Sequence, residues 1–242
     1  MSQEERPGTK KAKSGGVKTK VQTISENDRL FLTYYTDPLC CWSWGMHAAI
    51  SKLKEEYETA SWRYVVGGLI PDWQNFCDPV NSVTRPLQMG PVWMHASQVS
   101  GVSIDHNLWF RDPPISSYPA CIAFKAVQLQ SQEHAITYLR LLWETCMMHG
   151  KNISKQKELI DVAARLNLLY PHFDIKTFQK DLTNGKGLEA FKSDVHEIKI
   201  NNIARFPTLT IRIGQQCLLL TGYSPYERLV KAIDQLSASA YQ

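Results

Sequence analysis

Residues 37–45 read Asp37-Pro38-Leu39-Cys40-Cys41-Trp42-Ser43-Trp44-Gly45 and connect a predicted strand to a predicted helix. This stretch follows a β-branched and aromatic run, Phe31–Thr36, which predicts a strand that Pro38 ends. It precedes apolar residues spaced three or four apart between Gly45 and Thr59, which predict a helix. Cys40 therefore stands before a helix, where unpaired N–H groups and the positive end of the helix dipole favour a thiolate.

The strand and the helix on either side of this stretch belong to a β-α-β unit. A separate β-β-α unit is expected near the end of the chain. A second strand is expected at Trp62–Val66, and a helix between two strands favours parallel pairing. The last three elements, with a turn at Gly214-Gln215, are expected at Thr208–Ile213, Cys217–Thr221 and Pro225–Leu236. One crossover and one hairpin in a mixed sheet predict an α/β protein of thioredoxin-like topology.

A long insertion separates these two units. Residues 71–116 are rich in proline, and one short helix is expected there, near residues 91–99. Apolar spacing predicts five further helices, at Ala120–Gln130, Glu133–Met148, Gln156–Leu166, Ile175–Leu182 and Leu188–Ile203. The sequence thus predicts a thioredoxin-like domain of residues 28–70 and 204–242 and an inserted irregular and helical subdomain of residues 71–203.

Composition and charge exclude several classes of protein. The net charge is +4, and residues 1–27 supply most of it with six basic and three acidic residues, so the folded part is not built to neutralise phosphates. No stretch approaches the ~20 apolar residues of a membrane span. Residues 1–27 lack the apolar core of a signal peptide and read as a disordered basic tail. We expect a cytoplasmic protein with no nucleic-acid or membrane partner.

The cysteine turn alone does not establish a nucleophile. Cys40 and Cys41 could also serve as small apolar residues that pack in a turn. A second segment, Ala204–Thr208, favours the nucleophile. It places Pro207 at the start of a strand, where a residue without an N–H donor is tolerated. In the thioredoxin architecture this position faces the cysteine turn.

The two segments together resemble the DsbA-like thioredoxin superfamily, and within it the FrnE and 2-hydroxychromene-2-carboxylate isomerase branch of predicted protein-disulfide isomerases. That branch reads D-P-M-C-S-W-C-W-G where this chain has residues 37–45. Three further segments are similar in the same order: Gly67–Trp73, Pro113–Ala120 and Gly222–Tyr226. The resemblance covers about residues 30–236 and implies a DsbA-like fold with a large helical insertion. It also implies that Pro207 is a cis-proline and that the Phe206 backbone binds substrate.

The chain departs from this branch where the branch carries its second cysteine, because here the residue is Ser43. In a C-x-x-C site the first thiolate attacks a disulfide and the second thiol resolves the mixed disulfide, which a serine hydroxyl cannot do. Adjacent Cys41 is a poor substitute, since the bridge would close a strained ring. Disulfide reshuffling and glutathione-dependent reactions remain open, and the sequence does not tell whether Ser43 is natural or engineered.

The leading hypothesis is a monothiol thiol-disulfide oxidoreductase or isomerase of the DsbA type. Its catalytic residues are Cys40, the nucleophile, and Ser43, which supports the thiolate by a hydrogen bond. We expect the substrate groove to be lined by Trp42, Trp44, Phe206 and Pro207. By resemblance, glutathione is a co-substrate and nothing is tightly bound, and the partners are protein thiols and disulfides or a small glutathione-linked substrate.

Two other classes stay open. Loss of the second cysteine favours a non-catalytic adaptor or binding protein that keeps the thioredoxin groove. A glutathione-dependent isomerase or transferase acting on a small aromatic molecule is the third, because relatives of that kind carry serine in the turn. The sequence leaves the oligomeric state open.

The other reactive side chains are scattered. The histidines make no H-x-x-x-H pair and the cysteines no C-x-x-C pair, so we expect no metal site. We expect Cys121, Cys146 and Cys217 to be buried and Cys77 to be exposed. His47 lies two helical turns beyond Cys40, and we expect a solvated position on the helix face.

Overall fold

The structure is a computed structural model that describes residues 29–240, so the expected N-terminal tail lies outside the described residues. Its centre is a four-stranded sheet with the strand order β2-β1-β3-β4. The strands are β1 (Leu30–Thr36), β2 (Ser61–Val66), β3 (Thr208–Ile213) and β4 (Gln216–Thr221). All four expected strands are confirmed, with bounds that differ from the expectation by at most one residue.

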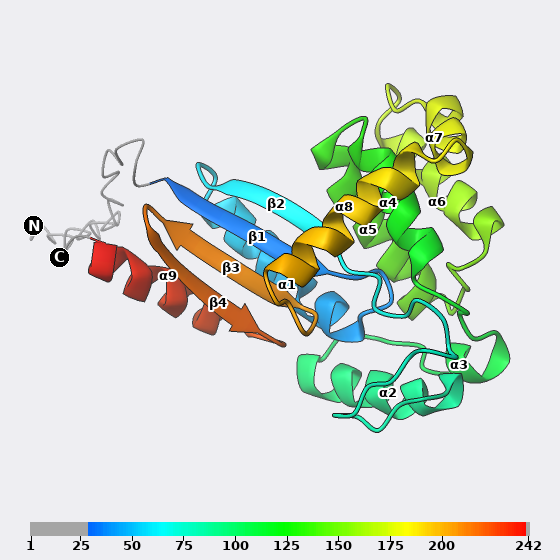
Figure 1. Ribbon diagram of the computed structural model, residues 1–242, viewed down its shortest axis with the longest axis horizontal. Helices are drawn as coiled ribbons and strands as arrows, with labels where there is room; N and C mark the ends of the chain where they lie inside the picture. The colour runs from blue at the N-terminus through cyan, green and yellow to red at the C-terminus, as the bar shows by residue number, and fades with distance from the viewer. Residues whose placement is uncertain (1–28, 241–242) are drawn as a thin grey trace, which may run out of the picture.

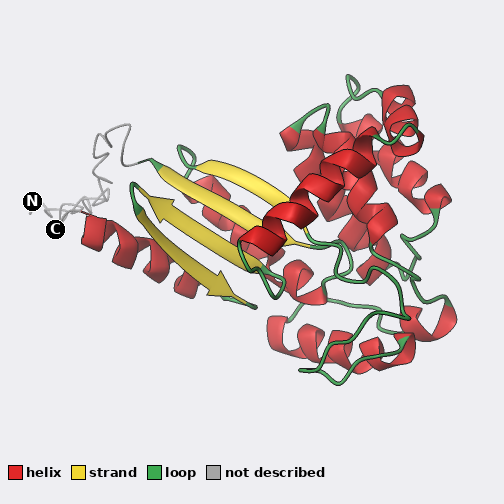
Figure 2. Cartoon of the chain, viewed as in Figure 1, coloured by secondary structure: helices red, strands yellow, loops and turns green. Residues whose placement is uncertain are grey.

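The sheet is mixed, as one crossover and one hairpin require. β1 pairs in parallel with β2, with Tyr34 opposite Tyr64, and antiparallel with β3, with Tyr34 opposite Leu209. β3 and β4 form an antiparallel hairpin whose turn contains Gly214 at φ 56. A glycine adopts this left-handed backbone without steric penalty. Figure 2 shows the sheet flanked by helices, and the predicted α/β topology is confirmed.

Helix α1 (Cys41–Glu56) begins earlier than its apolar spacing indicates. The sequence places the start at Gly45, but the residues from Cys41 are already helical because Cys40 is the N-cap. The buried face of α1 carries Met46, Ile50 and Leu53, which pack on the sheet. The cysteine turn is therefore the first turn of a helix rather than a loop that precedes one.

Helices cover both faces of the sheet. α1 and α9 (Tyr226–Ala240) pack on one face, and α8 (Lys186–Ile200) crosses the other at the end near β2 (Figure 1). The alternation of strand side chains matches this arrangement, since Leu32 and Tyr34 belong to the main core. Tyr35 and Val65 form a separate small cluster with Ile203 after α8.

The insertion is helical, as expected, and its helices lie at one end of the sheet (Figure 1). Besides α8 it contains η2 (Pro86–Gln88), α2 (Met89–Ser100), α3 (Leu108–Arg111), α4 (Tyr118–Gln128), α5 (Gln132–Trp143), η3 (Glu144–Met148), α6 (Gln156–Leu169) and α7 (Ile175–Thr183). The helical stretch expected from Glu133 to Met148 is confirmed, and its last five residues form the π-helical turn η3. The short helices η2 and α3 were not expected from the sequence.

Four predictions of side-chain burial can be checked directly. Cys121 and Cys146 are buried and Cys77 is exposed, as expected. The prediction for Cys217 is wrong, since Cys217 is exposed. It lies on the edge strand β4 opposite exposed Arg212, on the sheet face that α9 does not cover.

The prediction for His47 is also wrong. His47 is half-buried, stacked on the Trp44 ring at 5.8 Å between centroids and 5.4 Å from the Trp143 ring. Burial, and next the positive charge of Arg140, lower the pKa of His47 to about 4. None of the helices between residues 29 and 240 has both the length and the apolar character needed to cross a bilayer.

Candidate active site

Cys40 lies at the junction of strand and helix that the sequence predicts. It is the N-cap of α1, with extended backbone dihedral angles of φ −80 and ψ 105. Its carbonyl oxygen accepts the N–H groups of Ser43 (3.1 Å) and Trp44 (3.2 Å), and its own N–H donates to the Asp37 carbonyl (3.0 Å). The turn that holds the thiol is therefore fixed by backbone hydrogen bonds on both sides.

Cys40 is buried, although its place before a helix favours an ionised thiol, and its role as a nucleophile stays a prediction. The residue is only 4% exposed, and burial raises the pKa of its thiol to about 12. The Ser43 hydroxyl and the backbone N–H groups of Ser43 and Trp42 lower this pKa, but they do not offset the loss of hydration. The helix N-terminus favours a thiolate, whereas burial of the thiol opposes it.

Ser43 occupies the position of the missing cysteine and is completely buried. Its hydroxyl would donate to a Cys40 thiolate, which is why it lowers the pKa of Cys40. With the thiol protonated, Ser43 Oγ has no hydrogen-bond partner of good geometry. The Ser43 carbonyl oxygen accepts the hydroxyl group of Tyr34 on β1 at 3.3 Å, which ties the first turn of α1 to the sheet.

Asp37 organises the site, a role that the sequence alone does not predict. The fully buried carboxylate accepts the N–H groups of Leu39 (2.8 Å) and Leu69 (2.7 Å), and the thiol of Cys121 lies 3.4 Å from it. Burial raises the pKa of Asp37, and the two backbone donors oppose this rise. The signal in the sequence is the Asp-Pro dipeptide before Cys40, which by itself predicts only the end of a strand.

The insertion also reaches the turn from the other side. The indole N–H of Trp143 on α5 donates to the carbonyl oxygen of Asp37 at 3.2 Å. The indole N–H of Trp44 donates to the carbonyl oxygen of Ser103, after α2. Both bonds join segments more than 50 residues apart, so the helical insertion is bound directly to the cysteine turn.

The proline loop connects to the cysteine turn through a short chain of contacts. The Phe206–Pro207 peptide bond is cis, as the resemblance implies. The Pro207 carbonyl oxygen accepts the N–H of Gly222 at 2.8 Å, and the next residue, Tyr223, packs on Trp42 at 6.0 Å between ring centroids.

Phe206 is half-buried beside the proline. A Cβ placed on Gly67 would come within 1.8 Å of the Phe206 ring, so glycine is required at that position. A role in substrate binding for Trp42, Trp44, Phe206 and Pro207 stays a prediction.

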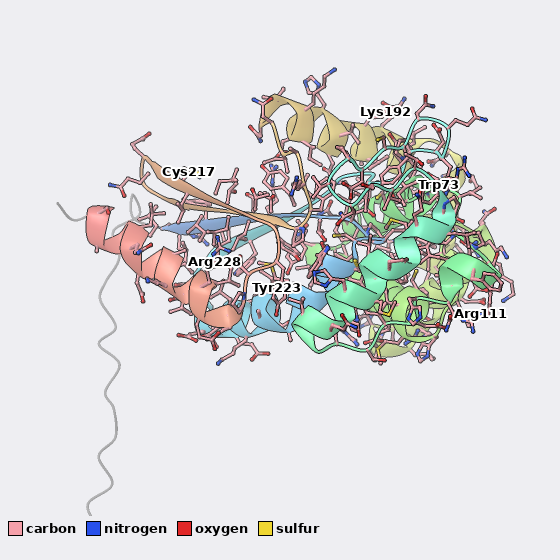
Figure 3. All side chains as sticks on the ribbon, turned by 90° about the horizontal axis from the view of Figure 1, so that it is seen from below. Trp73, Arg111, Lys192, Cys217, Tyr223 and Arg228 are labelled. Carbon is pink, nitrogen blue, oxygen red and sulfur yellow. The ribbon has the colours of Figure 1, made fainter. Side chains whose placement is uncertain are left out.

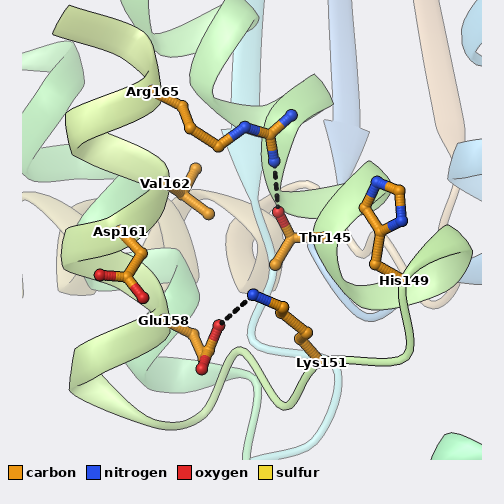
Figure 4. Close-up of a pocket in the computed structure, with 7 residues that line it drawn as sticks. All are labelled: Thr145, His149, Lys151, Glu158, Asp161, Val162 and Arg165. Carbon is orange, nitrogen blue, oxygen red and sulfur yellow. Dashed lines mark hydrogen bonds and ion pairs between the residues drawn. The ribbon is translucent and has the colours of Figure 1, made fainter.

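A separate hollow lies in the insertion, around the π-helical turn η3 (Figure 4). Its walls carry an ion pair, with Lys151 Nζ 3.6 Å from Glu158 Oε2. Arg165 also donates a hydrogen bond to the Thr145 hydroxyl at 3.0 Å. The lining residues are Thr145, His149, Lys151, Glu158, Asp161, Val162 and Arg165, and none is a predicted site residue. Within residues 29–240, no three His, Cys, Asp or Glu side chains gather in a way that could hold a metal ion.

Similar sequences are curated as adapter proteins. The chain is 30% identical over 178 residues to the ClpXP adapter protein SpxH of Bacillus subtilis, and 26% identical over 206 residues to the SpxH of Halalkalibacterium halodurans. These matches cover 73% and 84% of this chain. The chain spans 56% and 66% of the length of these two relatives, less than two thirds in each case.

Solved structures show the same fold at lower identity. A candidate protein disulfide isomerase from Nitrosomonas europaea superposes with a TM-score of 0.72 at 19% identity, over 86% of this chain and 97% of the other. The cytosolic disulfide reductase DsbM from Pseudomonas aeruginosa gives 0.62 at 18% identity, over 87% and 97%. A 2-hydroxychromene-2-carboxylate isomerase gives 0.61 at 16% identity, over 87% and 98%.

The fold is thus the thioredoxin-like α/β fold with a helical insertion, in its DsbA-like form. A family model described as Thioredoxin matches residues 34–231, which is most of the chain and includes the cysteine turn and the proline loop. The chain therefore belongs to the thioredoxin family.

Proposed function

We propose that this protein is an adapter that binds protein partners through its thioredoxin fold and does not cycle thiols. The observation that carries the proposal is the state of Cys40, whose thiol is 4% exposed and has a pKa raised to about 12. Only a thiolate attacks a disulfide efficiently, and at neutral pH this thiol is protonated. Ser43 supplies no sulfur to resolve a mixed disulfide.

The similar proteins support the same conclusion. The SpxH relatives are named as adapters of ClpXP, so we propose that this chain links a client protein to ClpXP or to a machine of the same kind. An adapter needs two protein-binding surfaces and no redox turnover. A buried, neutral cysteine turn in a rigid fold meets that requirement, because it can serve as structure without reacting.

The test measures binding and turnover in the same preparation. Purified full chain is immobilised, and its binding to purified ClpXP is measured by biolayer interferometry for the wild type and for Cys40→Ala. We expect saturable binding that the substitution leaves unchanged, because the thiol is not used. In the same buffer, reduction of insulin disulfides by dithiothreitol should proceed no faster with either chain than without protein.

Two outcomes would overturn the adapter proposal. One is acceleration of insulin reduction by the wild type that Cys40→Ala abolishes, since that shows turnover at this thiol. The other is an absence of any ClpXP binding by either chain. Loss of binding in Cys40→Ala alone would also contradict a purely structural cysteine.

A monothiol reaction with glutathione is the second candidate, and the position of Cys40 at the N-cap of α1 favours it. In this reaction the Cys40 thiolate attacks the glutathione sulfur of a protein–glutathione mixed disulfide and releases the protein thiolate; a free glutathione thiolate then attacks the glutathione sulfur on Cys40, which forms oxidised glutathione and restores the Cys40 thiolate. Resemblance to the disulfide isomerase branch supports this candidate. Intact-mass analysis after mixing with oxidised glutathione distinguishes the two: the adapter proposal expects no adduct at Cys40 in the folded protein.

A further inference from the structure

Helix α2 presents an outer face that carries no Lys, Arg, Asp or Glu. The whole segment from Pro86 to Ile104 lacks these four residue types. The exposed residues of α2 are Pro91, Met94, His95, Gln98 and Val99. A surface helix ordinarily turns charged residues to water, so this face is not built for hydration alone.

Large apolar side chains follow this face. Leu87 on η2 is 62% exposed, Met94 is 42% exposed and Val99 is 50% exposed. Leu87, Pro91, Met94 and Gln98 are spaced by four, three and four residues, which places them along one side of a helix. Phe110 on α3, which packs against η2, is 78% exposed. We call Leu87, Met94, Val99 and Phe110 the α2 surface.

The α2 surface stands free of other elements and is rigid. Figure 3 shows α2 along the outside of the molecule, between Tyr223 and Arg111. Beneath it, the buried Trp93 ring packs edge-to-face on Trp109 at 5.1 Å, and Trp109 packs in the same way on Trp73 at 5.8 Å. A surface held by such packing loses little entropy when a partner binds.

The same surface is continuous with the cysteine turn. His95 on α2 packs edge-to-face on Trp42 of α1 at 5.5 Å between ring centroids. Near the end of α2, a Cβ on Gly45 would come within 2.8 Å of Ser100 Cβ, so the two helices are in close contact there. A chain bound along α2 would therefore lie next to the first turns of α1, the helix that Cys40 caps.

We propose that the α2 surface is a docking site for an uncharged, apolar segment of a client protein. This inference rests on the adapter function proposed above and specifies its client-binding surface. The absence of charge on α2 selects the occupant. A charged side chain of the partner would lose water on this surface and would meet no opposite charge there. A membrane surface is not the occupant, since lipid-binding helices carry Lys and Arg on their polar face and this segment has none.

The test uses peptides as probes. A phage-displayed library of random peptides, about 16 residues long, is selected against the full chain, and the dissociation constants of enriched peptides are measured by fluorescence polarisation. We expect the enriched peptides to be apolar and poor in charge. Met94→Glu, Met94→Lys and Val99→Glu should each weaken binding about tenfold or more, because either sign of charge is equally unpaired.

Leu168→Glu is the matched control. Leu168 is an exposed leucine on α6, 83% accessible and outside the α2 surface, so its variant should bind the peptides like the wild type. The inference is overturned if no peptide is enriched, if the enriched peptides are rich in charge, or if the three variants bind as well as the wild type. The inference is also overturned if only one of Met94→Glu and Met94→Lys weakens peptide binding. A wild-type dimer in sedimentation that Met94→Glu dissociates would overturn it too, because the occupant would then be a second copy of this chain.

This test and the adapter test can fail separately. If insulin reduction depends on Cys40 and the peptides still require the α2 surface, the adapter proposal falls and the docking surface stands. If the chain binds ClpXP without thiol turnover and the peptides are insensitive to all three variants, only the α2 inference falls.

Discussion

The Asp194 carboxylate on α8 accepts the backbone N–H of Val66, the last residue of β2, at 2.9 Å, although the two residues are 128 positions apart. Lys125 on α4 completes this contact, with its Nζ 2.7 Å from the other carboxylate oxygen. Both side chains are about nine-tenths buried. Asp194 therefore joins two helices of the insertion to the end of β2. The loop that follows β2 carries Leu69, whose N–H binds Asp37.

Breaking this buried pair should destabilise the protein. Lys125→Met removes the partner of a buried carboxylate, and we expect the free energy of unfolding in urea to fall by about 3 kcal/mol. Lys157→Met is the matched control, because Lys157 pairs with Asp161 on the exposed side of α6 and should change little. Equal effects of the two substitutions would show that Asp194 does not depend on Lys125.

Thiol labelling should follow exposure rather than helix position. In the native protein at pH 8, iodoacetamide should modify exposed Cys77 and Cys217 first, and Cys40 only after unfolding. The reason is that burial keeps the Cys40 thiol protonated and out of contact with the reagent. Peptide mapping by mass spectrometry over time measures the order, and Cys40 labelling first would restore the nucleophile hypothesis.

Restoring the second sulfur should restore a disulfide. In Ser43→Cys the new thiol lies one turn beyond the N-cap, a spacing compatible with disulfide geometry. Oxidation during refolding should lower the intact mass by two hydrogens, but because both thiols are buried, the folded variant should reduce insulin with dithiothreitol no faster than the parent. A Ser43→Cys, Cys40→Ala double variant is the control and should show no loss of mass. If the single variant forms no internal bridge, residues 40–43 do not form a thioredoxin-like turn.

Acid should destabilise the protein in part through His47. Its pKa is about 4 in the folded protein, against the ordinary histidine value of 6.5 in the unfolded chain, so the unfolded chain binds more protons between these values. The stability contributed by neutral His47 is therefore complete above pH ~6.5 and lost as the pH falls towards 4, by about 2–3 kcal/mol.

His47→Phe keeps a neutral ring between Trp44 and Trp143 and removes this titration. The difference in unfolding free energy between wild type and variant should be constant above pH ~6.5 and should shift in favour of the variant as the pH approaches 4. A pH-independent difference, measured by urea unfolding, would place the His47 ring in water.

The order of the elements and the position of the thiol can be predicted from local stretches of sequence. Strands β1 to β4 follow from β-branched and aromatic runs, and the start of the third strand at Thr208, directly after Pro207, follows from the missing N–H of proline. Cys40 at a helix N-terminus follows from residues within one turn of it. These features depend on local backbone preferences, which a short stretch of sequence contains.

The behaviour of the site depends on contacts between segments that are far apart in the sequence. Burial raises the pKa of the Cys40 thiol, and the turn that holds it is bound by α5, whose Trp143 donates to the carbonyl oxygen of Asp37 across 106 residues. His47 is half-buried for the same reason, and Cys217 is exposed because no helix covers its side of β4. Whether a side chain is hydrated depends on which segments pack against it from elsewhere in the chain. The periodicity of a strand or helix indicates that one face is covered, but it does not indicate which segment covers that face.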